Sequence, residues 1–170
     1  DAGLFCNLKD ATVENLVIDP SCSFNGYSAG ALSALVTGSL TVKNTTNKAA
    51  VSGGDEVGGF IGEAQYLIQP LLISFIFCVN DGKVTGSHQN IGGFAGLIYH
   101  NDKIILELSN SINNGPVSGI YEIGGFAGQI SWNKKMNTTF SNSTNNGIVS
   151  GSGQYAGGFV GSLYCNSYAV

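Results

Sequence analysis

A short glycine-phenylalanine motif that occurs four times constrains the fold of this chain more than any other feature. It reads Val-Gly-Gly-Phe-Ile-Gly at 57–62, and close copies stand at 91–96, 123–128 and 156–161. The phenylalanines of successive copies are 34, 32 and 33 residues apart. A fixed period of this size is typical of repeat proteins, in which each unit packs on its neighbours.

A second motif lies upstream of each copy. It begins with an asparagine and ends in Val-Ser-Gly or Val-Thr-Gly, and its equivalent valines are Val51, Val84, Val117 and Val149. Further upstream, the segments 40–44, 73–77, 106–110 and 138–142 have the composition of extended strands. Each repeat therefore predicts a strand, an Asn/Gly turn, a second strand, a short loop and a Gly-rich strand.

The first part of the chain is a divergent form of the same unit. Residues 12–18 and 24–26 supply its two strands, and Ala29-Gly30-Ala31-Leu32 replaces the glycine-phenylalanine motif. Residues 2–5 resemble that motif once more. We therefore expect one domain over 1–170, with a divergent first repeat at 1–38 and regular repeats at 39–170.

Stacking of these repeats predicts an all-β fold, a parallel β-helix or β-solenoid of about five repeats of roughly 33 residues. Equivalent residues of stacked coils lie about 4.8 Å apart. The paired glycines allow sharp turns, positive φ and close backbone approach, and the large residue after them is expected to form a buried core column of Leu32, Phe60, Phe94, Phe126 and Phe159. The alternative is a set of hairpins in a sandwich or a propeller, but propeller repeats are usually longer.

The repeated Val-Ser-Gly and Val-Gly-Gly-Phe-Ile-Gly unit, with Cys-Val-Asn-Asp-Gly at 78–82 upstream of one copy, resembles the GLUG-motif repeats of large surface and secreted proteins. The resemblance covers nearly the whole chain and implies a β-solenoid with a role in adhesins or at the cell surface. It brings no catalytic residue to this chain. Ala31 and Ala34 depart from it, because they stand where the motif has glycine.

Composition argues against several partners. The chain has 43% hydrophobic and 11% charged residues, seven lysines without an arginine, and a net charge of −4. Arginine is the preferred bidentate reader of phosphate, so we expect no nucleic-acid partner. The longest apolar run, 71–79, is too short to span a bilayer, so no membrane span is predicted.

Three N-glycosylation sequons, at Asn44, Asn137 and Asn142, favour an extracellular, cell-surface or secreted protein that carries N-linked glycans. The chain begins at Asp1 without an initiator methionine, which suggests processing or a fragment. Of the four cysteines, Cys6 and Cys22 both lie in the opening coil and are the expected disulfide pair. Cys78 and Cys165 fall in different columns, and no bridge is expected between them.

Two patterns could carry catalysis, and each has a simpler interpretation. Gly26-Tyr27-Ser28-Ala29-Gly30 matches the nucleophile elbow of hydrolases, for which Asp55 or Asp81 with His88 or His100 could complete a triad. Ser28 is, however, at a repeat position that also holds Glu56, Asn90, Glu122 and Tyr155. Among the acidic residues only Glu56 and Glu122 share a column, two coils apart, so solvated loop charges are preferred to an acid and base pair. We expect no enzyme activity.

Binding of a metal or cofactor is likewise not expected. His88 and His100 are interpreted as exposed loop histidines without a third ligand. Asn80-Asp81-Gly82 begins like a calcium loop but lacks its later ligands, and is interpreted as a corner turn. Tyr66, His100 and Trp132 follow the glycine motif by equivalent steps and form either a ridge that stacks on sugars or a cover over the core's edge.

The expected function is therefore that of an extracellular structural or adhesive repeat module. Neither end carries a proline, a run of charges or a capping helix, and Leu4, Phe5, Phe159 and Val160 are predicted to lie at assembly ends. The partner there is a second copy stacking end to end into a fibril, or neighbouring repeats of the same chain. The alternative function is a carbohydrate-binding or carbohydrate-active β-helix domain, with surface carbohydrate as its partner.

Overall fold

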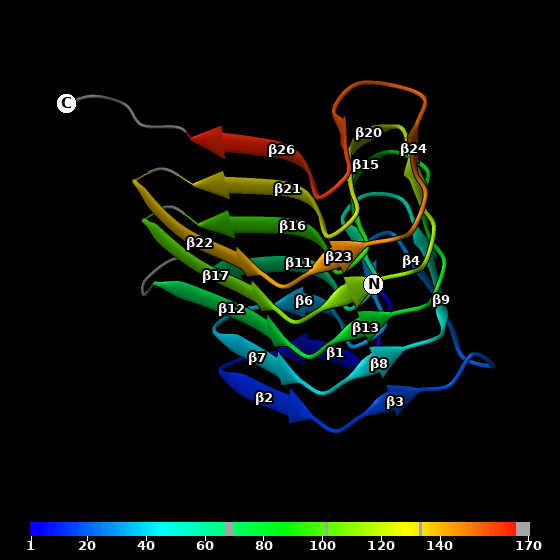
Figure 1. The fold of residues 1–170 in the computed structure, drawn as a ribbon, viewed down its shortest axis with the longest axis horizontal. Coiled ribbons are helices and arrows are strands. Elements are labelled where there is room, and N and C mark those ends of the chain that lie inside the picture. Colours follow the sequence, from blue (N-terminus) through cyan, green and yellow to red (C-terminus); the bar gives the residue numbers. More distant parts are fainter. Residues whose placement is uncertain (67–69, 101, 133, 166–170) are drawn as a thin grey trace.

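The computed structural model describes residues 1–66, 70–100, 102–132 and 134–165, and these residues form a parallel β-solenoid of about five turns (Figure 1). They make 26 strands and no helix. The parallel pairing confirms the predicted solenoid, since hairpins of a sandwich or propeller would pair antiparallel strands. The described chain accordingly offers no helix of the length and apolarity that crossing a membrane requires.

Each turn passes through five parallel sheets, which we number I to V in chain order. Sheet I contains β2 (Ala11–Glu14), β7 (Leu40–Lys43), β12 (Leu71–Ile76), β17 (Lys103–Ser109) and β22 (Lys135–Ser141). Sheet II contains β3 (Val17–Ile18), β8 (Thr46–Asn47), β13 (Val79–Asn80), β18 (Ile112–Asn113) and β23 (Thr144–Asn145). Sheet III contains β4 (Ser23–Gly26), β9 (Ala50–Gly53), β14 (Val84–Gly86), β19 (Val117–Gly119) and β24 (Val149–Gly151).

The remaining two sheets carry the glycine-phenylalanine motif. Sheet IV contains β5 (Ala29–Gly30), β10 (Val57–Gly58), β15 (Gln89–Gly92), β20 (Tyr121–Gly124) and β25 (Ala156–Gly157). Sheet V contains β1 (Phe5–Leu8), β6 (Ser33–Val36), β11 (Ile61–Tyr66), β16 (Ala95–His100), β21 (Ala127–Trp132) and β26 (Val160–Cys165). We call β2–β6 coil 1, β7–β11 coil 2, β12–β16 coil 3, β17–β21 coil 4 and β22–β26 coil 5; β1 precedes coil 1.

The hydrophobic core lies inside the coil and takes buried side chains from all five sheets, and a column of phenylalanines runs through it. Phe60, Phe94, Phe126 and Phe159 follow one another with ring centroids 4.9, 4.8 and 4.9 Å apart. Leu32 holds the same register position in coil 1 and is fully buried. These spacings equal the rise between parallel strands, so each ring packs on the next without disturbing the backbone ladder.

A second column, of buried asparagines, runs through sheet II. Asn47 donates from Nδ2 to Asn80 Oδ1, Asn80 to Asn113, and Asn113 to Asn145, at 2.8 Å in each case. Each of the four also donates to the carbonyl two residues onward in its own coil. The amides therefore satisfy one another and the corner backbone inside the core, where an unpaired amide would be costly. We call this column the asparagine ladder.

Two corners of the coil use left-handed backbone. Between sheets I and II, Asn15, Asn44, Asn110 and Asn142 have φ of 44–58°, and Phe77 takes the same conformation at 54°. Asparagine tolerates this region better than other non-glycine residues. At the corner between sheets III and IV, Glu56, Asn90, Glu122 and Tyr155 have φ of 47–65°.

The motif glycines allow neighbouring coils to pack closely. They do not adopt the positive φ that the sequence also allows. Among the described residues no glycine has a positive φ. A Cβ on Gly93 would lie 2.1 Å from the Gly125 carbonyl oxygen in the next coil and 2.7 Å from the Asn113 side chain. Only glycine leaves room there for the neighbouring coil and the asparagine ladder.

The structure holds Cys6 and Cys22, the expected disulfide pair, as free and exposed thiols. Cys6 lies on β1 in sheet V, whereas Cys22 lies in the loop between sheets II and III, so the fold places them on different sheets. Cys78 and Cys165 are free as well. Cys78 is buried at the start of sheet II, and burial raises the pKa of its thiol to about 11.

The phenylalanine column makes a direct prediction about stability. Replacing Phe94 by Ala removes a fully buried ring that packs on Phe60, Phe75 and Phe126, so we expect a loss of about 3–5 kcal/mol in the free energy of unfolding. Phe159→Ala is the matched control, because that ring is 37% exposed and packs on Phe126 from one side. Chemical denaturation measures both. A Phe94→Ala loss below about 1 kcal/mol would contradict the column.

The asparagine ladder makes a second prediction. Asn80→Ala removes two ladder bonds and leaves Asn113 Oδ1 and the Gly82 carbonyl without their donor. We expect a loss of about 2–4 kcal/mol in unfolding free energy. Asn145→Ala, at the half-exposed end of the ladder, should cost only about 1 kcal/mol. Equal losses for the two variants in denaturant titrations would show that the ladder does not act as a buried network.

Candidate functional site

Of the residues that could form a hydrolase triad, Asp55 and His88 meet at 2.6 Å, but the Ser28 hydroxyl is bonded elsewhere. Ser28 is buried, and its hydroxyl donates to the carbonyl oxygens of Ala34 and Glu56, at 3.2 and 3.4 Å. It therefore binds the backbone between coils 1 and 2. Asp81 is exposed and accepts a hydrogen bond from Nδ2 of Asn114, the equivalent residue of the next coil. The serine thus occupies a structural repeat position.

A cluster of polar side chains does assemble at the corner between sheets III and IV, and we call Tyr27, Asp55, His88 and Tyr121 the corner cluster. Tyr27 donates to Asp55 Oδ2 at 2.5 Å, and His88 Nδ1 lies 2.6 Å from Asp55 Oδ1. The Gln89 amide donates to the same Oδ1 at 3.1 Å. The rings of His88 and Tyr121 meet edge to face at 6.1 Å. The cluster thus links four successive coils along one edge of the rod.

The electrostatics of this corner separate its carboxyl groups. Burial opposes ionisation of Asp55, which is 5% exposed, but hydrogen bonds from Tyr27, Gln89 and His88 hold its pKa below the usual range. The bond to Asp55 raises the pKa of the Tyr27 phenol. Burial, together with the nearby charges of Glu63 and Asp55, raises the pKa of Glu56 to about 7. Burial also raises the pKa of Glu63 and of Glu122.

This separation of pKa values resembles that of an acid and base pair, so the contacts of each carboxyl group decide what the corner can do. Both oxygens of Asp55 accept hydrogen bonds at this corner. Glu56 and Glu122 hold equivalent positions two coils apart, with buried Asn90 at the same position between them. This column therefore keeps a full coil between its two carboxyl groups, and the carboxyl groups that act on Glu56 are those of Glu63 and Asp55.

Of the two histidines, one matches the exposed loop residue that the sequence predicts and the other does not. His88 is exposed in the loop between β14 and β15, where Asp55 holds its ring. His100 lies at the end of β16 and is fully buried, so its prediction as an exposed loop residue was wrong. Its Nδ1 accepts the backbone N–H groups of Asp102 and Lys103, which places its proton on Nε2. His100 aligns with Tyr66 and Trp132 in sheet V, and its burial favours the interpretation of this row as a cover over the core's edge.

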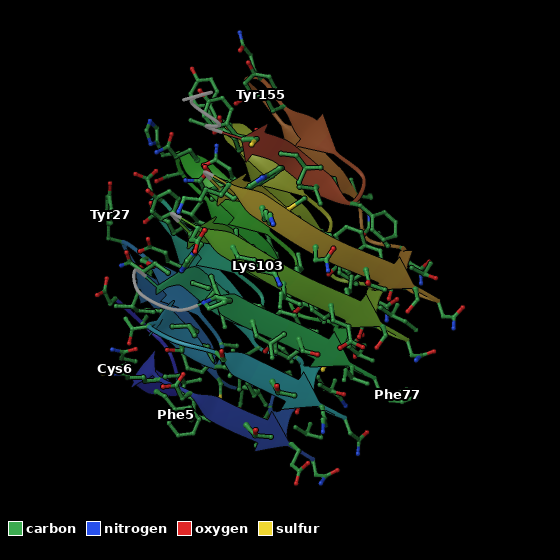
Figure 2. The ribbon with its side chains drawn as sticks, turned by 90° about the vertical axis from the view of Figure 1, so that its left-hand side faces the viewer. Phe5, Cys6, Tyr27, Phe77, Lys103 and Tyr155 are labelled. Atoms are coloured by element: carbon green, nitrogen blue, oxygen red, sulfur yellow. The ribbon has the colours of Figure 1, made fainter. Side chains whose placement is uncertain are left out.

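The outer face of sheet III is a shallow depression that the corner cluster borders. Asn25, Ser52, Thr85, Ser118 and Ser150 are in register across it, one from each coil. Glycines of the same strands line this depression, together with Tyr27 and Ser87. Figure 2 shows Tyr27 projecting outward from this edge of the rod. The face offers hydroxyl donors and acceptors beside an exposed aromatic ring.

The sequon asparagines Asn44, Asn137 and Asn142 are exposed. Asn44 and Asn142 share the left-handed corner between sheets I and II, whereas Asn137 lies within β22. Asn44 Nδ2 donates to Asn15 Oδ1 at 2.8 Å, and Asn142 Nδ2 to Asn110 Oδ1 at 3.4 Å. The three sequons therefore lie on the outside of the coil.

Sequence reasoning missed the asparagine ladder and the corner cluster. A signal for the ladder exists, because Asn47, Asn80, Asn113 and Asn145 are invariant among the repeats, whereas the next residue varies. The corner cluster has no such signal, since its members come from loops of different length.

No group of three His, Cys, Asp or Glu side chains within the described ranges is placed to hold a metal ion. Comparisons of the chain with protein-family models, with curated proteins and with solved structures find no match. The chain is an all-β parallel β-solenoid built from repeats of about 32 residues.

The raised pKa of Glu56 predicts a pH dependence of stability. The unfolded chain ionises Glu56 near 4.5 and the folded chain near 7, so the folded state holds the proton more tightly. Stability from this group is complete below about 4.5 and is lost as pH rises to about 7. Glu56→Gln should be more stable than the parent, on the order of 1–3 kcal/mol, at pH 8 but not at pH 4.

Denaturation at the two pH values measures this difference. Glu122→Gln is the matched control, because Glu122 shares the corner position and backbone conformation, but the charge of nearby His88 offsets part of the rise that burial causes in its pKa. Its pH dependence should be the smaller one. A parent and a Glu56→Gln variant with parallel pH profiles would show that Glu56 ionises normally.

Proposed function

We propose that this chain is a structural or adhesive repeat module of an extracellular or cell-surface protein. It acts as a rigid rod segment that holds its loops and N-linked glycans outward and joins further coils at its ends. One observation carries the proposal: the residues that recur in every repeat are used in coil stacking. The phenylalanine column, the asparagine ladder and the close-packed glycines all face neighbouring coils.

The outer surface supports the same function. Its charge is sparse, and Asn, Ser and Thr replace charged side chains over the corners and the sheet III face. The exposed sequons at Asn44, Asn137 and Asn142 suit glycans that keep neighbouring rods apart. As part of this proposal we assign the repeats to the GLUG-like type found in large surface and secreted proteins, on the strength of the Val-Ser-Gly and Gly-Gly-Phe-x-Gly motifs.

A second candidate function is carbohydrate binding at the sheet III face. The observation that favours it is the row of Ser and Thr hydroxyls beside Tyr27, with Tyr121 further along the same edge. Tyrosine rings and hydroxyl groups can provide stacking and hydrogen bonds to a sugar. This function would use the rod as a scaffold and is compatible with the first.

Mass spectrometry and electron microscopy of the natively sourced protein test the proposal. We expect a loss of intact mass on glycosidase treatment, and peptide mapping should place glycans at Asn44 and Asn142. Micrographs should show elongated rods. Unglycosylated material with globular particles would contradict the structural function. Oligosaccharide titration is the test of the second candidate, which requires saturable binding that Tyr27→Ala abolishes and the distant Phe140→Ala leaves unchanged.

A further inference from the structure

The last coil presents a face on which, among the described residues, no further coil meets the groups that stack between coils elsewhere. In Figure 1, β26 is the top strand of sheet V and β22 the upper edge strand of sheet I. On this face Phe140 and Phe159 are 40% and 37% exposed, and their ring centroids are 6.2 Å apart. Phe126, which is equivalent to Phe159 in the coil before, is only 2% exposed. A Cβ on Gly158 would meet nothing within 4 Å, whereas one on the equivalent Gly125 would lie 2.2 Å from the Gly158 carbonyl oxygen.

The backbone on this face is open in the same register. Phe60, Phe94 and Phe126 each donate their N–H to the carbonyl oxygen of the phenylalanine in the next coil, at 2.8–2.9 Å. Phe159 accepts such a bond from Phe126. The N–H of Phe159 holds the same register position from which Phe60, Phe94 and Phe126 donate to the next coil. An exposed strand edge of this kind is a template for one more strand.

The asparagine ladder adds chemical specificity to this edge. Its amides all donate in one direction, toward the last coil. Asn145 accepts from Asn113 and, within the described part of the chain, donates only to the Gly147 carbonyl in its own coil. The second amide hydrogen of Asn145 is therefore in the position from which Asn47, Asn80 and Asn113 reach the next asparagine.

We infer that this face is an interaction surface for one further parallel coil of the same repeat type, with an asparagine over Asn145 and a Gly-Phe pair over Gly158 and Phe159. The argument is continuity with an interface that the chain already makes four times between its own coils. The inference rests on the proposed structural function and identifies the partner at this end of the rod.

The described N-terminal face of a second copy does not meet these requirements. Ile18 takes the ladder position in coil 1 and pairs in register with Asn47. Stacked on the last coil, Ile18 would bury the Asn145 amide without an acceptor, at a cost of about 1–3 kcal/mol.

The layers of the two faces also differ. Sheet V has six strands, because β1 precedes coil 1, whereas sheets I, II and III have five. A second copy with its β1 paired to β26 would leave one empty strand position, about 4.8 Å high, in each of those three sheets. A separate coil that starts in sheet I would fill these three strand positions and would place an asparagine in sheet II over Asn145.

Two chains of equal length test the inference. In the first, a copy of residues 101–132 is inserted after Cys165, so that the copied Asn113 lies over Asn145. In the second, the same copy is inserted after Trp132, so that the added coil is internal and Phe159 remains on the last face. Hydrogen exchange of the Phe159 amide should slow by roughly 100-fold or more in the first chain and stay at the parent rate in the second.

A third chain changes the copied asparagine of the terminal insertion to Ile, the residue of coil 1. We expect the Phe159 protection to fall back by at least about 10-fold, which corresponds to about 1.4 kcal/mol. The internal insertion shows whether the copied coil folds at all. If it folds there but the terminal coil leaves Phe159 unprotected, or if the Ile variant protects equally well, the inference is overturned.

Sedimentation of the parent chain at high concentration tests the competing occupant. We expect a monomer. Rods that Leu4→Lys and Phe159→Lys both disperse would show that the chain's own N-terminal face is the partner, and would overturn the inference. These outcomes are independent of the proposed function, since coil addition can succeed in a protein whose native form lacks glycans and rods.

Discussion

The rise of about 4.8 Å between parallel strands is the constraint on which the rest of this structure depends. Every side chain that points into the rod meets its own equivalent at that distance. Phenylalanine rings fit it, with centroids 4.8–4.9 Å apart. Asparagine amides fit it as well, because a side chain held at this spacing reaches the next oxygen at 2.8 Å. Residues that cannot stack on themselves, such as charged groups, are consequently confined to corners and outer faces.

That constraint explains why the fold was predictable and the corner cluster was not. The periods of Phe60, Phe94, Phe126 and Phe159 follow from the need to stack, so sequence alone indicated the solenoid. The Asp55–His88 contact does not follow from the repeat register. Asp55 lies two residues before the sheet IV position Val57 of its coil, whereas His88 lies three residues before the equivalent Ile91. Their meeting depends on loop length and on a backbone conformation that no local pattern specifies.

The same contrast holds for single residues whose environment is set by the coil. His100 looks like a loop histidine from its neighbours, yet it ends a six-residue strand and faces the core because Ile98, two positions earlier, does so. Cys6 and Cys22 are close in sequence order around the first turn, but the coil carries them to different sheets. Sequence proximity in a solenoid is therefore a poor guide to contact, whereas register is a good one.

The asparagine ladder also gives the rod a direction. Backbone strands in a parallel sheet already run one way, but their edges offer donors and acceptors at both ends of the stack. The ladder differs because each amide gives a hydrogen to the next coil and receives one from the coil before. At the first coil, Ile18 ends it with an apolar side chain, while at the last coil Asn145 still has a hydrogen to give. The two faces are chemically different even where their strand edges look alike, so side-chain chemistry distinguishes the two ends of the stack.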